Sequence, residues 1–417
     1  MQEAIILGGG IIGLASAYYL QKNGYKITVI DRQAEVGLET SFANGAQLSY
    51  SYVAPLAEPS VLPKLPHWLL DRQSPLRFKP SLDPADLCWG LKFLKACNAS
   101  LSRQTTRELL SLSFLSRDLF HELQPQLGDI SFAAAGKLVM HRDPSSFAHA
   151  QAQLQVQQQL GCKQEALDIQ QCIAKEPALA PLASTFCGGI YTDSEEVADS
   201  YKFCLALKHL LEQQGAQFLT GRTIMSLRQT PDQRVSLQLD DGQCLQAPVI
   251  VAALGSFTPQ LLKPLGLSLP IAPLKGYSLT LEITQPQAAP HISITDFQKK
   301  VVFARLDHRL RVAGMADRVG LDQSLARDRI DLLKQQAKAV FPEAGSYDEA
   351  ITWAGLRPAT PKGKPIIDKT PFKNLYINSG QGALGLTLAL GSAALLVDVI
   401  EGQNSRIDVR PFSLAQA

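Results

Sequence analysis

A glycine-rich turn near the N-terminus, GGGIIG at residues 8–13, constrains this chain more than any other feature. An uninterrupted apolar run, AIILG at 4–8, precedes the turn, and a stretch with apolar residues at helical spacing follows it as far as Gly24. A second apolar run, KITVID at 26–31, comes next and ends in an acid. Strand, turn, helix and strand in this order predict a parallel β–α–β unit.

The glycine spacing of this unit is typical of a dinucleotide site. Gly8 permits a tight turn, Gly10 allows a pyrophosphate to approach the backbone, and Gly13 lets the helix lie close to the strands. Phosphates bind at such a helix N-terminus because its free N–H groups and its dipole favour negative charge. Asp31 ends the second strand, where a carboxylate accepts hydrogen bonds from ribose hydroxyls. The predicted contacts in this unit are Gly8, Gly10, Ile11, Ile12, Gly13, Asp31 and Arg32.

These residues alone do not separate NAD from FAD, but three further segments favour FAD. ETSFANGAQLS (39–49) places polar side chains near an extended nucleotide, and VIVAALGSF (249–257) resembles the apolar strand that closes many flavoprotein nucleotide domains. INSGQGALG (377–385) is a second glycine-rich turn from a strand into a helix. Its helix N-terminus would stabilise the negative charge that develops on the flavin pyrimidine edge on reduction. The remaining predicted FAD contacts are Thr40, Ser41, Asn44, Gly45, Ala46, Gln47, Ile224, Gly255, Gly380, Gln381, Gly382, Leu384 and Gly385.

Composition limits the function classes. Forty basic and 38 acidic residues leave a formal charge of +2, which gives no electrostatic case for a nucleic-acid partner. The seven cysteines are scattered without a CxxC pair, as expected for reduced thiols in a cytosolic protein. No apolar run reaches the ~20 residues that span a bilayer, and the histidines show no metal-ligand spacing. We therefore expect a cytoplasmic protein without a metal site.

The order of the predicted elements indicates an α/β fold with two domains. Units of the parallel type lie at both ends of the chain, whereas alternating strands fill its middle. We expect a Rossmann-type FAD-binding domain with an inserted α+β substrate domain built on a mixed or antiparallel sheet. The FAD-binding domain would comprise residues 1–55, 146–268 and 346–417, and the substrate domain residues 56–145 and 269–345.

Longer motifs carry a resemblance to a known family. The most specific are PLKGYSLT (273–280), RLRVAGMADRVG (309–320) and WAGLRPATPKGKPII (353–367). With them the chain resembles, nearly end to end, the D-amino-acid dehydrogenase small-subunit family, within the D-amino-acid oxidase and glycine oxidase superfamily of FAD-dependent oxidoreductases. The resemblance implies a flavoprotein of amino-acid catabolism with non-covalent FAD, which takes a hydride from the α-carbon of a D-amino acid to flavin N5. Hydrolysis of the imino acid then gives a 2-oxo acid and ammonia.

The resemblance also implies roles for four candidate catalytic residues. Arg357 in GLRP matches the arginine that holds the substrate carboxylate, for which a planar guanidinium fork is well suited. Tyr52 matches a tyrosine in the loop after the first flavin segment, Tyr277 lies on a strand that faces the flavin, and Gln381 takes the place of a family histidine. The alternatives are that Arg357 pairs with a local acid and that the phenols only pack. No dedicated base is required if the substrate amine binds in its neutral form.

Four departures from the family pattern cluster where flavin and substrate should meet. They are Gln381, Leu386 in place of tryptophan, NGAQ at 44–47, and SYSY at 49–52, which adds the bulk of Tyr50. The substrate is therefore less constrained than the cofactor. The first hypothesis is a D-amino-acid dehydrogenase that passes electrons to a quinone or another acceptor that is not oxygen. The alternative is an oxidase or dehydrogenase of glycine, sarcosine, proline or hydroxyproline-type secondary amines, and a third is a flavin-binding subunit without catalysis.

The location of the protein stays partly open in the sequence. Apolar and basic residues between 55 and 128, including HWLLDRQSPLRFK and LCWGLKFLK, are compatible with a membrane surface and a quinone, or with an ordinary packing face. We expect the protein in the cytoplasm, and association with the inner face of the cytoplasmic membrane is the open alternative.

Overall fold

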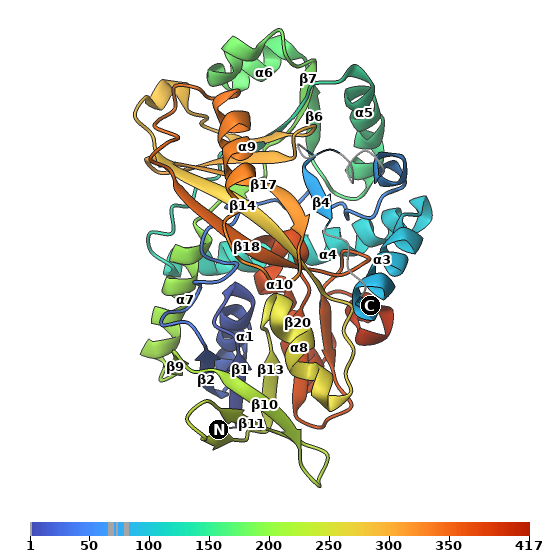
Figure 1. Cartoon of the computed structure of the whole chain (residues 1–417), viewed down its shortest axis with the longest axis vertical. Coiled ribbons are helices and arrows are strands. Elements are labelled where there is room, and N and C mark those ends of the chain that lie inside the picture. The colour runs from blue at the N-terminus through green and yellow to red at the C-terminus, as the bar shows by residue number, and fades with distance from the viewer. Residues whose placement is uncertain (1, 66–70, 72–73, 79–82) are drawn as a thin grey trace.

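The computed structural model describes residues 2–65, 71, 74–78 and 83–417, and two large sheets dominate this part of the chain (Figure 1). The six-stranded sheet, in the lower half of the view, has the order β19-β20-β13-β1-β2-β9, with parallel neighbours except for β19 and β20. Its strands are β1 (Glu3–Leu7), β2 (Lys26–Asp31), β9 (Gln217–Thr220), β13 (Val249–Ala252), β19 (Ile366–Lys369) and β20 (Leu375–Ser379).

The larger, nine-stranded sheet lies in the upper half of the view and mixes parallel and antiparallel pairs (Figure 1). Its order is β18-β14-β17-β16-β15-β5-β7-β6, and β4 pairs with β17. The strands are β4 (Leu76–Phe78), β5 (Lys137–His141), β6 (Gln164–Leu167), β7 (Gly188–Thr192), β14 (Ala272–Glu282), β15 (Ser293–Asp296), β16 (Val301–Leu306), β17 (Arg309–Arg318) and β18 (Ile351–Ala359). A short pair, β3 (Gln47–Leu48) with β8 (Glu196–Val197), completes the mixed architecture. The predicted fold class is confirmed.

Alternation along β1 explains how the six-stranded sheet is covered on both faces. Ala4 and Ile6 point into the core shared with helix α1 (Ile11–Lys22), while Ile5 and Leu7 point into a second core. That second core is shared with a small antiparallel sheet of β10 (Ile224–Gln229), β11 (Val235–Leu239) and β12 (Cys244–Leu245). Because both faces are buried, β1 is apolar without interruption from Ala4 to Leu7. The predicted β–α–β unit is confirmed.

Helix α10 (Gly385–Glu401) lies at the centre of the molecule and packs against α1 and α4 (Ala99–Leu123) (Figure 1). The expectation about membrane spans concerned apolar runs, and a test on helix length and mean hydropathy gives a different result. Among the described residues, one helix, Gly382–Glu401, passes that test. Its leucines nevertheless belong to the buried core, and 61% of its most apolar window is buried inside the protein, as in a core helix.

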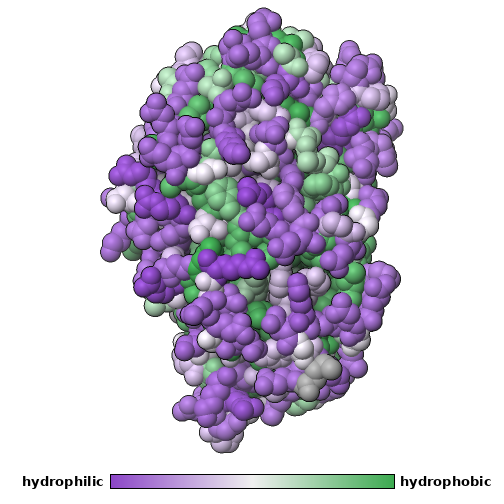
Figure 2. Space-filling model, turned by 180° about the vertical axis from the view of Figure 1, so that it is seen from behind, coloured by the Kyte–Doolittle hydropathy of each residue, from purple (hydrophilic) through white to green (hydrophobic). Residues whose placement is uncertain are grey.

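The remaining helices cover the sheets and the edges of the molecule. On the face seen in Figure 2 the surface is mainly hydrophilic, and apolar side chains gather around its mid-height. The remaining helices, which cover the sheets and the edges, are α3 (Pro84–Ala96), α5 (Pro144–Gln159), α6 (Ile169–Lys175), α7 (Ser200–Gln213), α8 (Thr258–Leu262) and α9 (Arg327–Lys338).

The sheets support a discontinuous first domain but suggest different boundaries for it. All three expected segments, 1–55, 146–268 and 346–417, contribute strands to the six-stranded sheet. Within them, however, β6, β7 and β18 join the nine-stranded sheet. In 56–145, α4 packs on α10 and shares the core of α1. The division into domains therefore stays a prediction, and we propose to assign these three strands to the substrate domain and α4 to the FAD-binding domain.

Candidate active site

A cavity of about 1050 Å³ is lined by elements of both large sheets, and both glycine-rich turns open into it. Its wall includes the turn after β1, the segment that leads into β3, several strands of the nine-stranded sheet and the first turn of α10. Of the residues predicted to bind cofactor or substrate, all but Gly13 and Gly380 line it. The lining set is Gly8, Gly10, Ile11, Ile12, Asp31, Arg32, Thr40, Ser41, Asn44, Gly45, Ala46, Gln47, Tyr52, Ile224, Gly255, Tyr277, Arg357, Gln381, Gly382, Leu384 and Gly385.

The two predicted residues outside the wall shape the turns instead. A Cβ on Gly13 would lie 1.9 Å from the carbonyl oxygen of Gly8, so that only glycine lets α1 pack this closely on the turn. Gly380 has a φ of +91°, and a Cβ there would lie 2.8 Å from the side chain of Thr360. Both glycines therefore act through backbone geometry.

The first turn leaves space beside the N-terminus of α1. No side chain caps this helix through its Ncap residue Gly10, and Ser41 Oγ accepts the N–H of Ile11 at 3.1 Å. A Cβ on Gly10 would approach no atom more closely than Ser41 Oγ, at 3.5 Å, so the protein itself has room for one. A pyrophosphate bound at this helix end would use that space, because its oxygens accept from the N–H groups there. The residues present therefore fit a dinucleotide.

Asp31 lies at the end of β2, where the ribose was expected. Its Oδ2 accepts the N–H of Gly9 at 2.6 Å and its Oδ1 accepts the N–H of Gln33 at 2.8 Å. Burial raises the pKa of Asp31, and these two N–H groups partly oppose the rise. Each carboxylate oxygen has a second lone pair for a hydroxyl donor. The neighbouring Arg32 donates to Glu39 at 2.6 Å at the rim of the cavity.

The segment after β2 is fastened to the nine-stranded sheet. Thr40 Oγ1 donates to the carbonyl oxygen of Leu356 on β18 at 2.9 Å, and Arg311 on β17 donates to the carbonyl oxygen of Asn44 at 2.9 Å. Asn44 Oδ1 also accepts the N–H of Ala46, which has a φ of +56°. These contacts hold the segment as one wall of the cavity between the two sheets.

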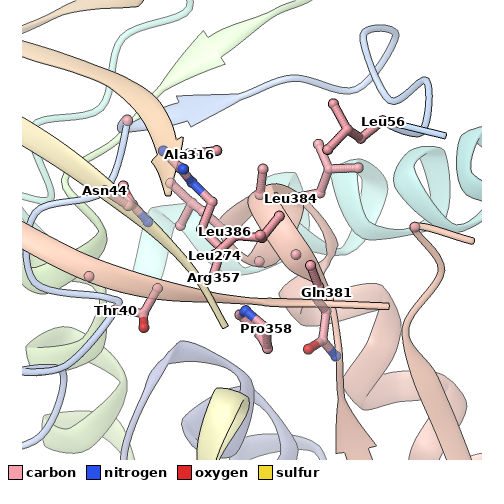
Figure 3. Close-up of a pocket in the computed structure, with 18 of the residues that line it drawn as sticks. Thr40, Asn44, Leu56, Leu274, Ala316, Arg357, Pro358, Gln381, Leu384 and Leu386 are labelled. Carbon is pink, nitrogen blue, oxygen red and sulfur yellow. The ribbon is translucent and has the colours of Figure 1, made fainter. Parts of the chain in front are cut away.

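The second glycine-rich turn ends at α10 without a side-chain cap. Gln381 donates through Nε2 to Asn378 Oδ1 at 2.7 Å, and Asn378 in turn donates to Ser16 on α1. Figure 3 shows the Gln381 amide directed away from Arg357 and Leu384. One of its amide N–H groups thus holds the turn in place, and the charge at this end of the cavity comes from the backbone N–H groups of the helix start.

Arg357 extends from β18 across the cavity wall. Its Nη1 donates to the carbonyl oxygen of Met315 at 2.7 Å, and Figure 3 shows the guanidinium group beside Ala316. Gly276 on β14 makes this position possible, since a Cβ there would lie 2.3 Å from Nη2. A glycine in the middle of the sequence KGYS therefore leaves room for the arginine next to it in the sheet.

The alternative that Arg357 pairs with a local acid is not seen in the described part of the chain, where no ion pair with Arg357 occurs. The nearby acid, Asp317, instead accepts from Arg329 at 2.6 Å. Burial lowers the pKa of Arg357 and the charge of Asp317 partly restores it. Arg357 therefore faces the cavity with guanidinium N–H groups beyond the one that Met315 accepts.

The two candidate tyrosines, Tyr277 and Tyr52, have different surroundings. The hydroxyl of Tyr277 donates to Asp317 Oδ2 at 3.0 Å, and burial raises the pKa of this phenol together with the negative charge of Asp317. Its ring forms cavity wall while its polar end is held inside the sheet. Tyr52 lies with its ring 4.4 Å from the Nζ atom of Lys137.

Tyr50 does not lie where flavin and substrate were expected to meet. It is fully buried outside the cavity wall, and its hydroxyl donates to Glu196 Oε2 at 2.8 Å. Leu386, by contrast, does line the cavity, as expected for a residue where flavin and substrate meet.

Lys137 is a charged residue of the cavity wall that the sequence analysis did not single out. Lys137 is 2% exposed and lines the cavity from β5. Alternation along its strand, β5, places Lys137, Val139 and His141 on one face. All three do line the cavity. The sequence pattern does not say which face that is.

Comparisons with known proteins agree with this geometry. The family model of FAD dependent oxidoreductases, abbreviated DAO, matches residues 3–399. The chain belongs to this family. A D-amino acid dehydrogenase 2 of Ralstonia nicotianae is 43% identical over 99% of this chain and 100% of its own length. Another of that name, from Pseudomonas aeruginosa, is 42% identical over 98% of this chain and 97% of its own.

Solved structures of the family share the fold. Glycine oxidase from Geobacillus kaustophilus has a TM-score of 0.77 at 18% identity, with 100% of both chains covered. Iminodiacetate oxidase from Chelativorans has a TM-score of 0.74 at 21% identity, with 98% of both covered. The chain is thus an FAD-dependent oxidoreductase, and the predicted family, enzyme class and cofactor are confirmed.

Proposed function

We propose that this FAD-dependent oxidoreductase catalyses the oxidative deamination of a D-amino acid to the 2-oxo acid and ammonia, with FAD held non-covalently. The observation that carries the proposal is Arg357, a partly buried cation on the cavity wall with no carboxylate partner among the described residues. An arginine fork offers two parallel donors to a substrate carboxylate. The names of the relatives, D-amino acid dehydrogenase, support the stereochemistry and the use of an acceptor other than oxygen.

Different residues of this chain bind the cofactor and the substrate. The N–H groups at the start of α1 bind the pyrophosphate and Asp31 accepts from the ribose, while the start of α10 stabilises negative charge on the flavin. When bound, FAD supplies the acceptor for the hydride of the α-carbon. Arg357 fixes the α-carboxylate, and Tyr277, held by Asp317, closes the wall beside it. Catalysis then rests on alignment of a neutral amine, without a dedicated base.

Anaerobic reduction of the bound flavin tests this function. D-amino acids are expected to bleach the flavin absorbance, with L-enantiomers at least about a hundredfold slower. With the carboxylate held by Arg357 and the side chain held by the pocket, only one enantiomer directs its α-hydrogen toward the flavin. Dye-linked turnover should proceed without peroxide. Bleaching by glycine, sarcosine or L-proline in place of D-amino acids, or brisk peroxide formation, would favour the secondary-amine and oxidase alternative. No bleaching by any of them would favour a non-catalytic subunit.

We further propose that electrons leave to a membrane quinone and that α3 makes peripheral contact with the inner face of the cytoplasmic membrane. Trp89 and Phe93 on α3 line the cavity. Three leucines on the same helix, Leu87, Leu91 and Leu94, are 53%, 69% and 45% exposed. Exposed leucines beside lysines suit a lipid surface. Of the apolar and basic stretch, residues 66–70, 72–73 and 79–82 lie outside the described residues.

Replacing Leu91 with glutamate is expected to weaken binding to anionic lipid vesicles by about tenfold, since a leucine contributes ~1.5–3 kcal/mol when buried. Quinone reduction on vesicles should fall in parallel, and the dye-linked rate should not change. Ile351→Glu is the matched control, because Ile351 is an apolar side chain that is 66% exposed on the edge strand β18 and lies outside the cavity wall. Equal vesicle binding by both variants would show that α3 does not contact the membrane.

A further inference from the structure

Lys137 is a buried cation that the proposed mechanism does not use. It lies on β5, is 2% exposed and forms part of the cavity wall. Its Nζ donates to Ser49 Oγ at 2.9 Å and lies 4.4 Å from the centre of the Tyr52 ring. An ammonium group has three N–H donors, and Ser49 is its one hydrogen-bond partner in the described part of the chain.

A chain of contacts places Lys137 near the flavin end of the cavity. The N–H of Ser49, its partner, donates to Thr387 Oγ1 at 3.0 Å. Thr387 belongs to the first turn of α10, which carries the second glycine-rich turn, and Ser49, Tyr52 and Thr387 all line the cavity. Lys137 therefore lies beside the wall that would face both flavin and substrate.

The charge of Lys137 is incompletely balanced. Glu195 attracts it, but no carboxylate lies within 4.0 Å of its Nζ in the described ranges, and Glu195 Oε1 accepts the N–H of Ser51 instead. Burial lowers the pKa of Lys137 to about 8, and Glu195 opposes this. Lys275 shows the contrast, since this buried lysine of the same sheet donates to Asp322 at 2.9 Å and does not line the cavity.

Gln164 is a second polar residue of the cavity wall, and it lies in line with Lys137 across strands β5, β7 and β6. Thr192 on β7 pairs with Lys137 on one side and with Gln164 on the other, so the three side chains share a face. Gln164 lines the cavity, donates to Thr192 Oγ1 at 2.9 Å, and has a buried Oε1 without a hydrogen-bond partner among the described residues. This row thus offers a donor at Lys137 and an acceptor at Gln164.

We propose that Lys137 is a specificity-determining residue, which donates to an oxygen on the substrate side chain while Arg357 holds the α-carboxylate. This inference rests on the proposed function. The class of substrate is a D-amino acid whose side chain carries a carboxylate, carboxamide or hydroxyl oxygen. A lysine suits such a range because its compact ammonium does not demand the planar partner that a guanidinium prefers. The face of Tyr52 stabilises the cation when the site is closed to water.

Matched substrate pairs test the role of Lys137. The ratio of kcat/KM for D-glutamate to that for D-norvaline isolates the contribution of a side-chain carboxylate. The ratio for cis-4-hydroxy-D-proline to D-proline isolates the contribution of a side-chain hydroxyl. In Lys137→Met at least one ratio is expected to fall by about tenfold or more, the effect of losing a hydrogen bond to a charged group. Turnover of the apolar partner should stay within about threefold of wild type, because the methionine keeps the apolar stem.

Lys275→Met is the matched control, as it removes a buried amine from the same sheet without changing the cavity wall. Its ratios should equal those of wild type even if its melting temperature falls. Unchanged ratios in Lys137→Met, or an equal fall in Lys275→Met, would overturn the inference. A protein that turns over no D-amino acid would refute the proposed function instead.

A binding measurement on the wild-type holoenzyme needs no variant. D-2-methylglutamate has no α-hydrogen and so binds without reacting, as does D-2-methylnorvaline, which carries a methyl group in place of the side-chain carboxylate. The first should perturb the flavin spectrum with a dissociation constant at least about tenfold lower. Equal affinities for the two would remove the carboxylate from the proposed class of ligands and leave the hydroxyl pair to decide.

Discussion

Replacement of Arg357 with alanine is expected to lower kcat/KM for D-amino acids by about thirty- to several-thousandfold, with FAD retained. Loss of one partner of a buried, hydrogen-bonded charge pair costs ~2–5 kcal/mol, which gives this range. Arg357 lines the cavity, lacks a carboxylate partner among the described residues and is oriented by the Met315 carbonyl. Steady-state kinetics with an artificial dye measures the loss, and the flavin absorbance per protein checks that the cofactor remains.

The substrate itself supplies the control for this prediction. D-amino acid amides lack the anionic carboxylate, so their slower turnover should change little between wild type and Arg357→Ala. Arg357→Lys keeps the positive charge but loses the guanidinium fork. Its kcat/KM for D-amino acids should therefore lie between those of wild type and Arg357→Ala. Arg318→Ala is a matched variant, because Arg318 lies on β17 of the same sheet, separated from β18 by β14, and outside the cavity wall. An equal loss with acids and amides would mean that Arg357 only supports the wall.

Local patterns predicted the first nucleotide unit well. The run before Gly8, the glycine spacing and the acid at Asp31 are all short-range signals, and the structure has β1, α1 and β2 as expected. Local patterns did not predict which sheet each strand joins. Strands β6, β7 and β18 were expected in the first domain, yet they join the nine-stranded sheet, whose pairs link segments more than 100 residues apart. Such pairing depends on packing that no local window contains.

The same reason limits what the sequence says about side chains in the site. A motif marked Tyr277, but its hydroxyl is taken by Asp317, 40 residues away. Tyr50 lies in an altered loop, but its hydroxyl binds Glu196, 146 residues away. Lys137 was missed because the strand pattern gives two faces and only the fold decides which one meets the cavity. Sequence thus identified the residues of the cofactor turns better than the orientation of the groups around the substrate.

Replacement of Gly13 with alanine is expected to lower the free energy of unfolding by about 3 kcal/mol or more and to abolish retention of FAD. The added Cβ would lie 1.9 Å from the carbonyl oxygen of Gly8 and 3.0 Å from its carbon. Both are backbone atoms of the turn that follows β1, so α1 must move away from the strand. Urea unfolding of the protein without cofactor measures the loss of stability, and flavin content after purification measures retention.

Gly10→Ala is the informative companion, because it adds the same methyl group three residues earlier. Its Cβ would lie 3.5 Å from Ser41 Oγ, an ordinary contact, so the stability of the cofactor-free protein should stay within about 1 kcal/mol of wild type. The methyl group would nevertheless occupy the space beside the start of α1 where the pyrophosphate approaches. FAD affinity, measured by titration of the cofactor-free protein, should therefore fall by about ten- to a hundredfold. If Gly13→Ala unfolds like wild type, or Gly10→Ala binds FAD like wild type, the turn does not hold the cofactor in the way described.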